Sequence, residues 1–460
     1  MGTVHNNHYD LLVIGAGAAG SVAAHTAASN GARVALIERD KVGGTCLNYG
    51  CDPTKTLLHI ANMLHQAHHA ARYGLSIPSA EVEWEAAQRY MRQVISDIRG
   101  GSSDEAAAEM AKQGIEVVKG EATFISAHEV SVAGKTIAAD RIIIASGSQT
   151  IVPPIEGLDK VGFITNVEAV ALPTLPQQLA VVGGGAIGME FAQMFHRFGV
   201  EITVLERGPN LLDKEDRELA DLLCNLLTRE GIRMETDAEL RQVQSTPEGK
   251  CLKFHCGQGG EEEVEVDEIL LAIGRRPTLE KLNLAATGVK TGKKGISVDE
   301  TLRTSTPHIW AAGDVTGGYK FTHVAYEQGK LAAQNAFSAH PQPFTDRVIP
   351  WVTYTDPPLA HVGKTEDELR KEGIEYKVSR MKFSEVERAV ANGKTDGLVK
   401  LLVDTRGQIL GGHILGAGAD DLLAPLIVAM QAHLPVNMLA TSIIPYPTLS
   451  EAVRWAADRV

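Results

Sequence analysis

Cys46 and Cys51 are separated by four residues in the stretch 43-GGTCLNYGCDPTK-55. Such a pair could hold a metal ion, form a structural disulfide or act as a redox couple. A zinc site needs three or four ligands, and no second cysteine pair or cysteine–histidine cluster in the sequence completes this one. Five cysteines among 460 residues are too few for a disulfide scaffold. In a reducing compartment, a close pair is more typical of catalysis or metal binding than of structure.

Two further groups of possible ligands have simpler explanations. Cys251 and Cys256 lie in KCLKFHC, which has the pattern of a strand, so we expect their Cα atoms about 16 Å apart, too far for a disulfide. His65 and His69 lie one turn apart in the predicted helix 57–74, without an evident third acidic or thiol ligand. We therefore predict no metal site, and a solvated or interface helix.

The residues around Cys51 favour a redox role. Gly50 gives the backbone freedom just before the cysteine, and Pro53 suits the first turn of a helix. Cys51 is then expected near a helix N-terminus, where the helix dipole stabilises a thiolate. Lys55 follows one turn later on the same face and adds positive charge. A thiolate of this kind can attack a disulfide or contact a flavin.

A dinucleotide-binding pattern precedes the cysteines. The segment 9-YDLLVIGAGAAGSVAAHTAASNGARVALIERD-40 reads as a strand, a glycine-rich turn, an alanine-rich helix and a second strand that ends at Glu38. Gly15 permits the tight turn, Gly17 lets the backbone approach a pyrophosphate, and Gly20 lets the helix pack on the strand. The helix N-terminus offers free N–H groups to the phosphates, and Glu38 is placed to accept hydrogen bonds from a ribose.

The same pattern recurs in 179-LAVVGGGAIGMEFAQMFHRFGVEITVLERG-208. Its glycines are Gly183, Gly185 and Gly188, and its acidic residue, Glu206, lies at the same distance from the first glycine as in the first copy. Tight strand–helix turns alone would not require both acids. We therefore predict two dinucleotide sites. If one binds FAD and the other NAD(P)H, they would form a relay in which hydride passes from the nicotinamide to the flavin.

The end of the second copy bears on which nicotinamide nucleotide is used. The carboxylate of Glu206 repels a 2′-phosphate, whereas the adjacent Arg207 would accept one. Gly188 at the third glycine position, together with Glu206, makes us favour NAD over NADP.

Length and composition set the remaining limits. A chain of 460 residues suggests about two to four domains, and 44% hydrophobic with 22% charged residues is typical of a globular protein. A net charge of −13 without a basic stripe argues against a nucleic-acid partner. The apolar runs are too short to span a membrane, and the first residues do not resemble a secretory signal, so we expect a cytoplasmic protein.

The cysteine stretch resembles the active-site signature GGTCxxxGCxPxK of the pyridine nucleotide–disulfide oxidoreductases, which include dihydrolipoamide dehydrogenase, glutathione reductase and mercuric reductase. The resemblance covers the whole chain, because further motifs follow in the family's order. They are 141-RIIIASGS-148, 271-LAIGRRPT-278, 309-IWAAGDVTGG-318 and 445-PYPTLSEA-452. The fold class implied is α/β, with two Rossmann-like dinucleotide-binding domains, for FAD and NAD(P), and a C-terminal α+β dimerisation domain.

The resemblance also implies domain boundaries and an assembly. The FAD-binding domain would consist of residues 1–150 and 275–345, on either side of an NAD(P)-binding domain at residues 151–274. Residues 346–460 would form the interface domain of a homodimer, in which this domain completes the active site of the partner.

Several site residues carry roles that the resemblance implies. Cys46 resembles the interchange thiol that meets the substrate, and Cys51 resembles the thiol beside the flavin. Lys55 resembles the lysine near flavin N5, Glu190 its ion-pair partner, and Asp314 the acid at the ribityl and pyrophosphate region of FAD. The other cofactor-binding residues, besides the glycines and acids of the two turns, are Gly44, Thr45, Ser146, Gly147 and Gly274.

The C-terminal motif departs from the thiol–disulfide members of the family. Those members carry His-Pro-Thr-x-x-Glu, whose histidine shuttles the proton of the substrate thiol, whereas this chain has Tyr446, with Glu451 five positions later. Tyrosine, with a pKa of about 10, is a poor base near neutral pH, and loss of a general acid–base group typically slows a reaction about 10²–10⁴-fold. Tyrosine at this place resembles mercuric reductase, although no C-terminal cysteine pair follows Cys256. Tyr446 could equally be a plain interface aromatic.

Asp52 is a second departure, because the family usually has an apolar residue next to the flavin-side cysteine. A carboxylate close to Cys51 would raise the pKa of its thiol, unless the side chain points away along the helix. Ser146, in place of the more usual threonine, is conservative.

These observations predict an FAD-dependent NAD(P)H oxidoreductase whose Cys46–Cys51 disulfide passes electrons to a metal ion, a small disulfide or a quinone. Three alternatives stay open. A dihydrolipoamide dehydrogenase is supported by the C-terminal TLSE and by Glu206 but opposed by Tyr446. The others are a flavin diaphorase or transhydrogenase whose cysteines matter little, and a regulatory flavoprotein that uses the fold mainly for binding.

Overall fold

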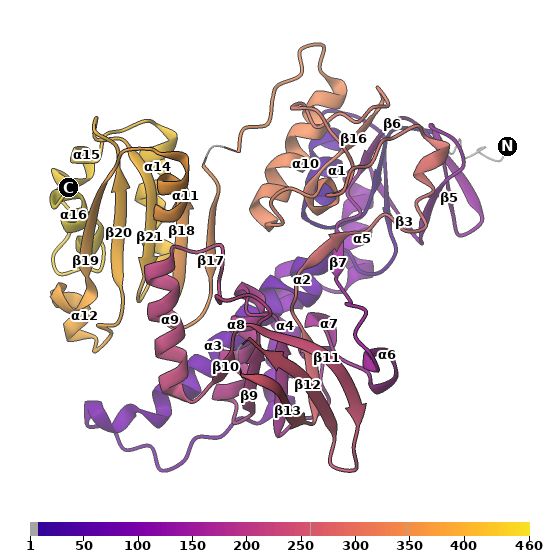
Figure 1. Ribbon diagram of the computed structural model, residues 1–460. Helices are drawn as coiled ribbons and strands as arrows, with labels where there is room; N and C mark the ends of the chain where they lie inside the picture. The colour runs from indigo at the N-terminus through magenta and orange to yellow at the C-terminus, as the bar shows by residue number, and fades with distance from the viewer. Residues whose placement is uncertain (1–7, 258, 347) are drawn as a thin grey trace. The chain divides into compact units, whose positions relative to one another are not determined.

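The computed structural model describes residues 8–257, 259–346 and 348–460. The chain divides into two compact units, which are described separately. The first comprises Met1–Thr56, Gln88–Ile151 and Gly274–Thr345, and the second comprises Leu57–Ala87, Val152–Ile273 and Asp346–Val460. Helices α3 (Cys51–His68) and α4 (Trp84–Arg99), both labelled in Figure 1, contain the first two positions at which the chain passes from one unit to the other.

A largely parallel sheet forms the centre of the first unit. Its strands, in order, are β3 (Ile115–Lys119), β2 (Val34–Glu38), β1 (His8–Ile14), β6 (Lys135–Ile144), β5 (Glu129–Val132) and β4 (Ala122–Phe124), while β16 (Ile309–Ala311) also pairs with β6. The strands β1, β2, β3, β6 and β16 are parallel, so their carboxyl ends meet at one edge. The glycine turn at Gly15 leaves the sheet at that edge.

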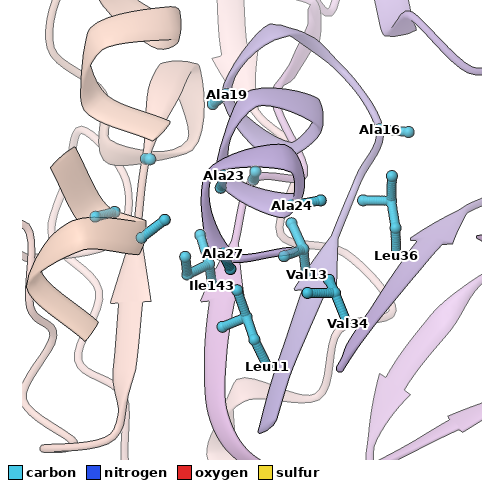
Figure 2. Close-up of a cluster of buried hydrophobic side chains, with 14 of the residues drawn as sticks. Leu11, Val13, Ala16, Ala19, Ala23, Ala24, Ala27, Val34, Leu36 and Ile143 are labelled. Atoms are coloured by element: carbon cyan, nitrogen blue, oxygen red, sulfur yellow. The ribbon is translucent and has the colours of Figure 1, made fainter. Parts of the chain in front are cut away.

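Small residues allow two helices to lie close together on one face of this sheet. Helix α1 (Ala18–Ser29) presents Ala23 and Ala27 to the strand residues Leu11 and Ile143, as Figure 2 shows. Helix α10 (Thr322–Phe337) packs on α1 so tightly that a methyl group at Gly329 would lie 2.1 Å from the carbonyl oxygen of Ala19. The alanine-rich helix predicted after the first turn is therefore confirmed.

The second unit contains two sheets in its middle segment. A parallel sheet consists of β10 (Arg233–Glu235), β9 (Glu201–Leu205), β8 (Gln178–Val182) and β14 (Glu268–Leu271), with α8 (Ala186–Arg197) following β8. An antiparallel sheet consists of β11 (Ala238–Ser245), β12 (Lys250–Cys256) and β13 (Gly260–Val266). Strand β12 has the bounds predicted for KCLKFHC.

The C-terminal segment of the second unit forms an antiparallel sheet. Its order is β17 (Pro350–Thr353), β18 (Leu359–Gly363), β21 (Ile409–Leu415), β20 (Leu398–Val403) and β19 (Lys377–Lys382). Helices α14 (Ala424–Gln431) and α16 (Glu451–Asp458) share one buried apolar cluster with its strands. Together the two units give the α/β class, with parallel dinucleotide-type sheets and an α+β C-terminal segment, that the sequence predicted. Within the described residues, no helix is long and apolar enough to cross a membrane.

Candidate functional site

The first glycine turn is fixed by close backbone contacts. Gly15 has φ +102°, and a methyl group there would lie 2.4 Å from the carbonyl oxygen of Ala145. A methyl group at Gly20 would lie 1.8 Å from the carbonyl oxygen of Gly15. Only glycine satisfies these two positions, because both the left-handed backbone and the helix–turn approach exclude a side chain. The protein's own packing therefore explains Gly15 and Gly20.

Gly17 is different, because neither its backbone angle nor the packing around it requires a glycine. It is the N-cap of α1 with φ −77°, and the nearest atom to a methyl group placed there would be the Cα of Gly44, at 3.9 Å. An added methyl group would thus find room directly before the first turn of α1. This is the room a pyrophosphate needs at a helix N-terminus.

Glu38 ends β2 beside the same turn. Its carboxylate is buried and accepts hydrogen bonds from the backbone N–H groups of Ala16 (2.8 Å) and Asp40 (2.7 Å). These bonds hold the acid against the glycine turn, so the placement predicted for a ribose-binding acid is consistent with its surroundings.

The second glycine turn repeats this arrangement. Gly183 has φ +112°, and a methyl group at Gly188 would lie 1.9 Å from the carbonyl oxygen of Gly183. Glu206 accepts from the N–H groups of Gly184 (2.8 Å) and Gly208 (2.7 Å). Relative to the first glycine and the acid, these donors occupy the same positions as Ala16 and Asp40 in the first turn. At Gly185, no described atom would come within 4 Å of an added methyl group.

The cysteine segment is tied directly to the first turn. The N–H of Gly43 donates to the carbonyl oxygen of Ala16 (2.9 Å), and a methyl group at Gly44 would lie 2.6 Å from the Cα of Gly17. From there α2 (Gly44–Tyr49) carries Thr45 and Cys46, and α3 begins at Cys51. The structure therefore brings Gly44 against the first dinucleotide turn, with Thr45 and Cys46 in the helix that starts there, and Cys51 lies at the helix start that the sequence predicted.

The two thiols differ in their acidity. Both are partly buried free cysteines. A hydrogen bond from Cys46, followed by Thr322 and the charge of Lys55, lowers the pKa of Cys51 to about 6, although burial opposes this. The same hydrogen bond and burial raise the pKa of the Cys46 thiol. The geometry thus favours a thiolate on Cys51 and a protonated thiol on Cys46 near neutral pH.

Thr322 was not among the predicted site residues. Its Oγ1 lies 3.4 Å from the Sγ of Cys51, and it is the first residue of α10, whose N-terminus therefore lies beside the thiolate. A hydroxyl donor and the positive end of a 16-residue helix both stabilise a negative sulfur. The sequence around Thr322 carries no local signal for this role, because the contact joins residues 271 positions apart.

Asp52 acts in the opposite direction. Its negative charge raises the pKa of both thiols, and burial raises the pKa of its own carboxyl. The carboxylate is therefore close enough to weaken the Cys51 thiolate, although less strongly than Cys46, Thr322 and Lys55 stabilise it.

A polar network joins the other motifs of the first unit. Ser148 donates to Asp314 and accepts from Nε of Arg275 (2.8 Å), while Ser146 donates to the carbonyl oxygen of Thr278 (2.8 Å). Gly147 and Gly274 both have positive φ, +70° and +121°. Arg275 and Ser148 were not predicted. Burial lowers the pKa of the Arg275 guanidinium, and the charge of Asp314 partly offsets this. Asp314 is thus held beside a buried cation.

The remaining predicted residues lie in the second unit. Glu190 is buried in α8 and accepts from the N–H of Tyr354 (2.9 Å). Tyr446 is 70% exposed, whereas Glu451 is buried at the start of α16 and accepts from the N–H of Thr448 (3.1 Å). Lys55 belongs to the first unit, and the ion pair predicted between Lys55 and Glu190 stays a prediction, as do the roles of Tyr446 and Glu451.

Comparison with known proteins accounts for this combination of sites. Residues 9–329 match the family described as pyridine nucleotide-disulphide oxidoreductase, and residues 349–457 match the dimerisation domain of that family. The chain belongs to this family. It is accordingly an FAD-dependent oxidoreductase that works with a pyridine nucleotide, and the C-terminal match supports a homodimer.

Individual relatives fall into two groups by name. The chain is 36% identical over 452 residues to a mercuric reductase of Staphylococcus aureus, covering 98% of this chain and 82% of the relative. It is 35% identical over 453 residues to the dihydrolipoyl dehydrogenase of Bacillus subtilis, covering 97% of each. Among solved structures, the HOCl-induced flavoprotein disulfide reductase RclA of Escherichia coli is similar, with a TM-score of 0.88, 31% identity and coverage of 98% and 100%.

Proposed function

We propose that this enzyme takes electrons from NADH and delivers them, through the Cys46–Cys51 pair, to a thiophilic metal ion or to a disulfide. The proposal rests on the surroundings of Cys51, which lower the pKa of its thiol to about 6. The segment that carries both cysteines is also hydrogen-bonded to the first glycine turn, through the N–H of Gly43. Such a site keeps a thiolate ready for thiol–disulfide exchange or for binding a soft metal.

The first turn is the better candidate for FAD. Gly17 and Glu38 would hold the pyrophosphate and ribose, and Gly43 and Gly44 place the cysteines beside this turn. Bound FAD would supply the relay of two electrons from the nicotinamide to the cysteine disulfide. The proposal includes an FAD-binding domain at residues 1–150 and 275–345, an NAD(P)-binding domain at residues 151–274 and an interface domain from residue 346.

The second turn is the better candidate for NADH. The space at Gly185 would admit the pyrophosphate, and Glu206, which two backbone N–H groups hold beside this turn, would accept hydrogen bonds from the ribose. A fixed carboxylate disfavours a 2′-phosphate, which supports NAD over NADP.

The protein's own sulfur chemistry follows from the two thiols. Two electrons and one proton open the disulfide to a Cys51 thiolate and a Cys46 thiol. The dithiol then gives two electrons to the acceptor and closes to the disulfide again. With a metal ion as acceptor the thiol proton leaves to solvent, and with a disulfide as acceptor it is taken up by the product thiols. Cys46 is the proposed point of exchange with the acceptor, because the family resemblance assigns Cys51 to the flavin side. The hydrogen-bonded Cys51 thiolate can take the proton of Cys46, which leaves Cys46 as the attacking thiolate.

Two observations favour a metal ion over a disulfide substrate. Tyr446 replaces the histidine that would carry a proton to a leaving thiol, and its side chain is exposed, so it could face a partner subunit. The relatives include mercuric reductases. The solved structures similar to this chain include a Cu(II) complex of the E. coli flavoprotein, with 30% identity and a TM-score of 0.88.

The test is an acceptor panel with NADH and NADPH, containing Hg²⁺, Cu²⁺, glutathione disulfide, lipoamide and a quinone. We expect the highest kcat/KM with NADH and a metal ion, and loss of that activity in both Cys46→Ser and Cys51→Ser. A quinone activity that survives in both variants, with no activity toward metals or disulfides, would instead identify a diaphorase.

Dihydrolipoyl dehydrogenase activity is the second candidate. It is favoured by the buried Glu451, whose carboxylate is positioned at the start of α16 as an orienting acid would be. If Tyr446 is what prevents this activity, Tyr446→His should raise lipoamide turnover by about 10²-fold or more. Strong lipoamide turnover by the unmodified enzyme would favour the dehydrogenase and contradict the role we give to Tyr446.

A further inference from the structure

Glu215 lies directly before α9 (Arg217–Glu230) and packs against the C-terminal sheet. It is 8% exposed, and His361 in β18 is 1% exposed. One carboxylate oxygen, Oε1, accepts hydrogen bonds from Nε1 of Trp351 (2.9 Å) and from the hydroxyl of Thr353 (3.3 Å). The imidazole of His361 stacks on the Trp351 ring, with 3.6 Å between centroids. The second oxygen of Glu215 therefore faces a buried histidine.

The hydrogen bonds of His361 define which of its nitrogens is protonated. Nε2 lies 2.9 Å from the carbonyl oxygen of Gly363, which can only accept, so Nε2 carries a hydrogen. Nδ1 lies 3.8 Å from Oε2 of Glu215. Neither atom has a hydrogen-bond partner within the described residues. Two facing lone pairs in a dry interior would repel, whereas a single proton on either atom makes the 3.8 Å contact attractive.

The neighbouring acid shows the other way to neutralise a buried carboxylate. Asp216 and Lys400 are each 1% exposed, and Nζ of Lys400 lies 2.9 and 3.0 Å from the two carboxylate oxygens. Lys400 also pairs with Glu218 and Glu366. No such lysine or arginine contacts the carboxylate of Glu215 among the described residues. A buried carboxylate without a cation is far more stable when protonated.

We propose that Glu215 and His361 hold one shared proton at neutral pH, and that this proton fastens the segment before α9 to the C-terminal sheet. The proton lies on Oε2 of Glu215 and faces Nδ1 of His361 across 3.8 Å, or it moves to the ring and leaves an ion pair; either form replaces the repulsion between the two atoms by an attraction. Loss of the proton leaves a buried carboxylate opposite a lone pair. The other charged or titratable groups facing the pair are Asp213 and Asp216 on the α9 side, His413 in β21 and Lys400 in β20.

The acidities of the two groups agree with this geometry. Burial, together with the charges of Asp216 and Asp213 and against the hydrogen bonds from Trp351 and Thr353, raises the pKa of Glu215 to about 7. Burial also lowers the pKa of His361 well below its usual value. Glu215 therefore prefers its neutral form in the folded protein, and His361 is the acceptor of its proton.

The sign of the pH dependence follows from counting protons. Between about pH 4.3 and 6.5, the unfolded chain holds one proton, on histidine, and the folded pair also holds one, so their contributions cancel. Above about pH 6.5 the unfolded chain has released its proton, while the folded pair keeps one until it titrates, at or above about pH 7. In this window stability falls as pH rises, by up to about tenfold in the folding equilibrium per pH unit.

The test compares the FAD-loaded wild type with Glu215→Gln, in which the amide N–H takes the place of the carboxyl O–H opposite Nδ1. Glu201→Gln, at an exposed position in β9, is the matched control. The thermal midpoint is measured from pH 6.0 to 8.5, and infrared spectra of the wild type and each variant are titrated for the carbonyl stretch of a protonated carboxylic acid.

We expect the wild type and Glu201→Gln to lose thermal stability relative to Glu215→Gln as pH rises from 6.0 until the folded pair titrates, at or above about pH 7, and the curves to run parallel above that pH. We also expect an infrared band at pH 6 that disappears on titration above about pH 7 and is missing in Glu215→Gln. Parallel midpoint curves for all three proteins from pH 6.0 upward would overturn the proposal. If Glu215→Gln does not fold, absence of any protonated-carboxyl band in the wild type at pH 6 overturns it as well.

Discussion

The turn at Gly15–Gly20 and the turn at Gly183–Gly188 repeat one another in their backbone contacts and in the two N–H groups that hold each acid. They differ in what lies in front of the middle glycine. At Gly17, residues 43–44 approach closely and lead into the cysteine helices, whereas the space at Gly185 is open to 4 Å. The first turn thus has the cysteine segment against it and the second has no described neighbour at its middle glycine, which supports our proposal that they bind different dinucleotides although their local sequences have the same pattern.

Cys51→Ser should have the largest effect, because it disables the cysteine pair beside the first turn and leaves the second turn unchanged. Without the thiolate, electrons cannot reach the acceptor through the disulfide, so we expect turnover with metal ions and disulfides to fall by about 10³-fold or more. The affinity for NADH, which we expect to bind at the second turn, should not change. It is measured by the quenching of NADH fluorescence on binding. Cys224→Ser, in α9, is the control and should keep full activity. Equal loss in both variants would point to general damage and not to the redox centre.

Gly17→Ala and Gly185→Ala test the comparison itself. Both glycines have φ near −78°, at −77° and −79°, and neither added methyl group would meet an atom closer than 3.9 Å, so both variants should fold. A methyl group in the pyrophosphate space should weaken binding on the order of tenfold to a hundredfold. We expect Gly17→Ala to lose FAD, measured by flavin absorbance per protein, and Gly185→Ala to keep FAD with a raised KM for NADH. The reverse result would exchange the two assignments.

Thr322→Val tests what stabilises the Cys51 thiolate beside the first turn. The substitution keeps the shape of the side chain but removes the hydroxyl that lies 3.4 Å from the Cys51 sulfur. A hydrogen bond to a charged group contributes about 1.5–3 kcal/mol, so we expect the Cys51 pKa to rise by roughly one to two pH units from about 6. The measurement is the pH titration of the thiolate–flavin charge-transfer absorbance in the two-electron-reduced enzyme. A shift of the midpoint to lower pH would contradict the role of Thr322.

Asp52→Asn should have the smallest effect and the opposite sign. The Asp52 charge raises the pKa of both thiols, so its removal should move the same titration to lower pH, by less than Thr322→Val moves it upward. Asp104→Asn, an exposed acid in the first turn of α5 (Ser103–Lys112), serves as the control for a change of net charge. If both variants shift the midpoint equally, Asp52 acts only through the overall charge of the protein.

Features of the fold and the site that depend on contacts between residues close in sequence could be predicted, whereas those that depend on distant residues could not. The glycine turns were predicted residue by residue because Gly15 and Gly20, and likewise Gly183 and Gly188, contact one another within a few positions of chain. The start of a helix at Cys51 followed from Gly50 and Pro53. The strand at residues 250–256 followed from its local pattern, whereas the α/β class was what the family resemblance implied.

The sequence by itself determined two dinucleotide turns, a reactive cysteine pair and the family to which they point, since each depends on residue types at fixed short spacings. The tertiary structure decided which turn receives the cysteines, through the approach of Gly44 to Gly17, and which hydroxyl and helix stabilise the thiolate, through Thr322. It also placed Arg275 on Ser148 and His361 opposite Glu215. These contacts join segments far apart in the chain, and only the folding of the sheets brings such segments together.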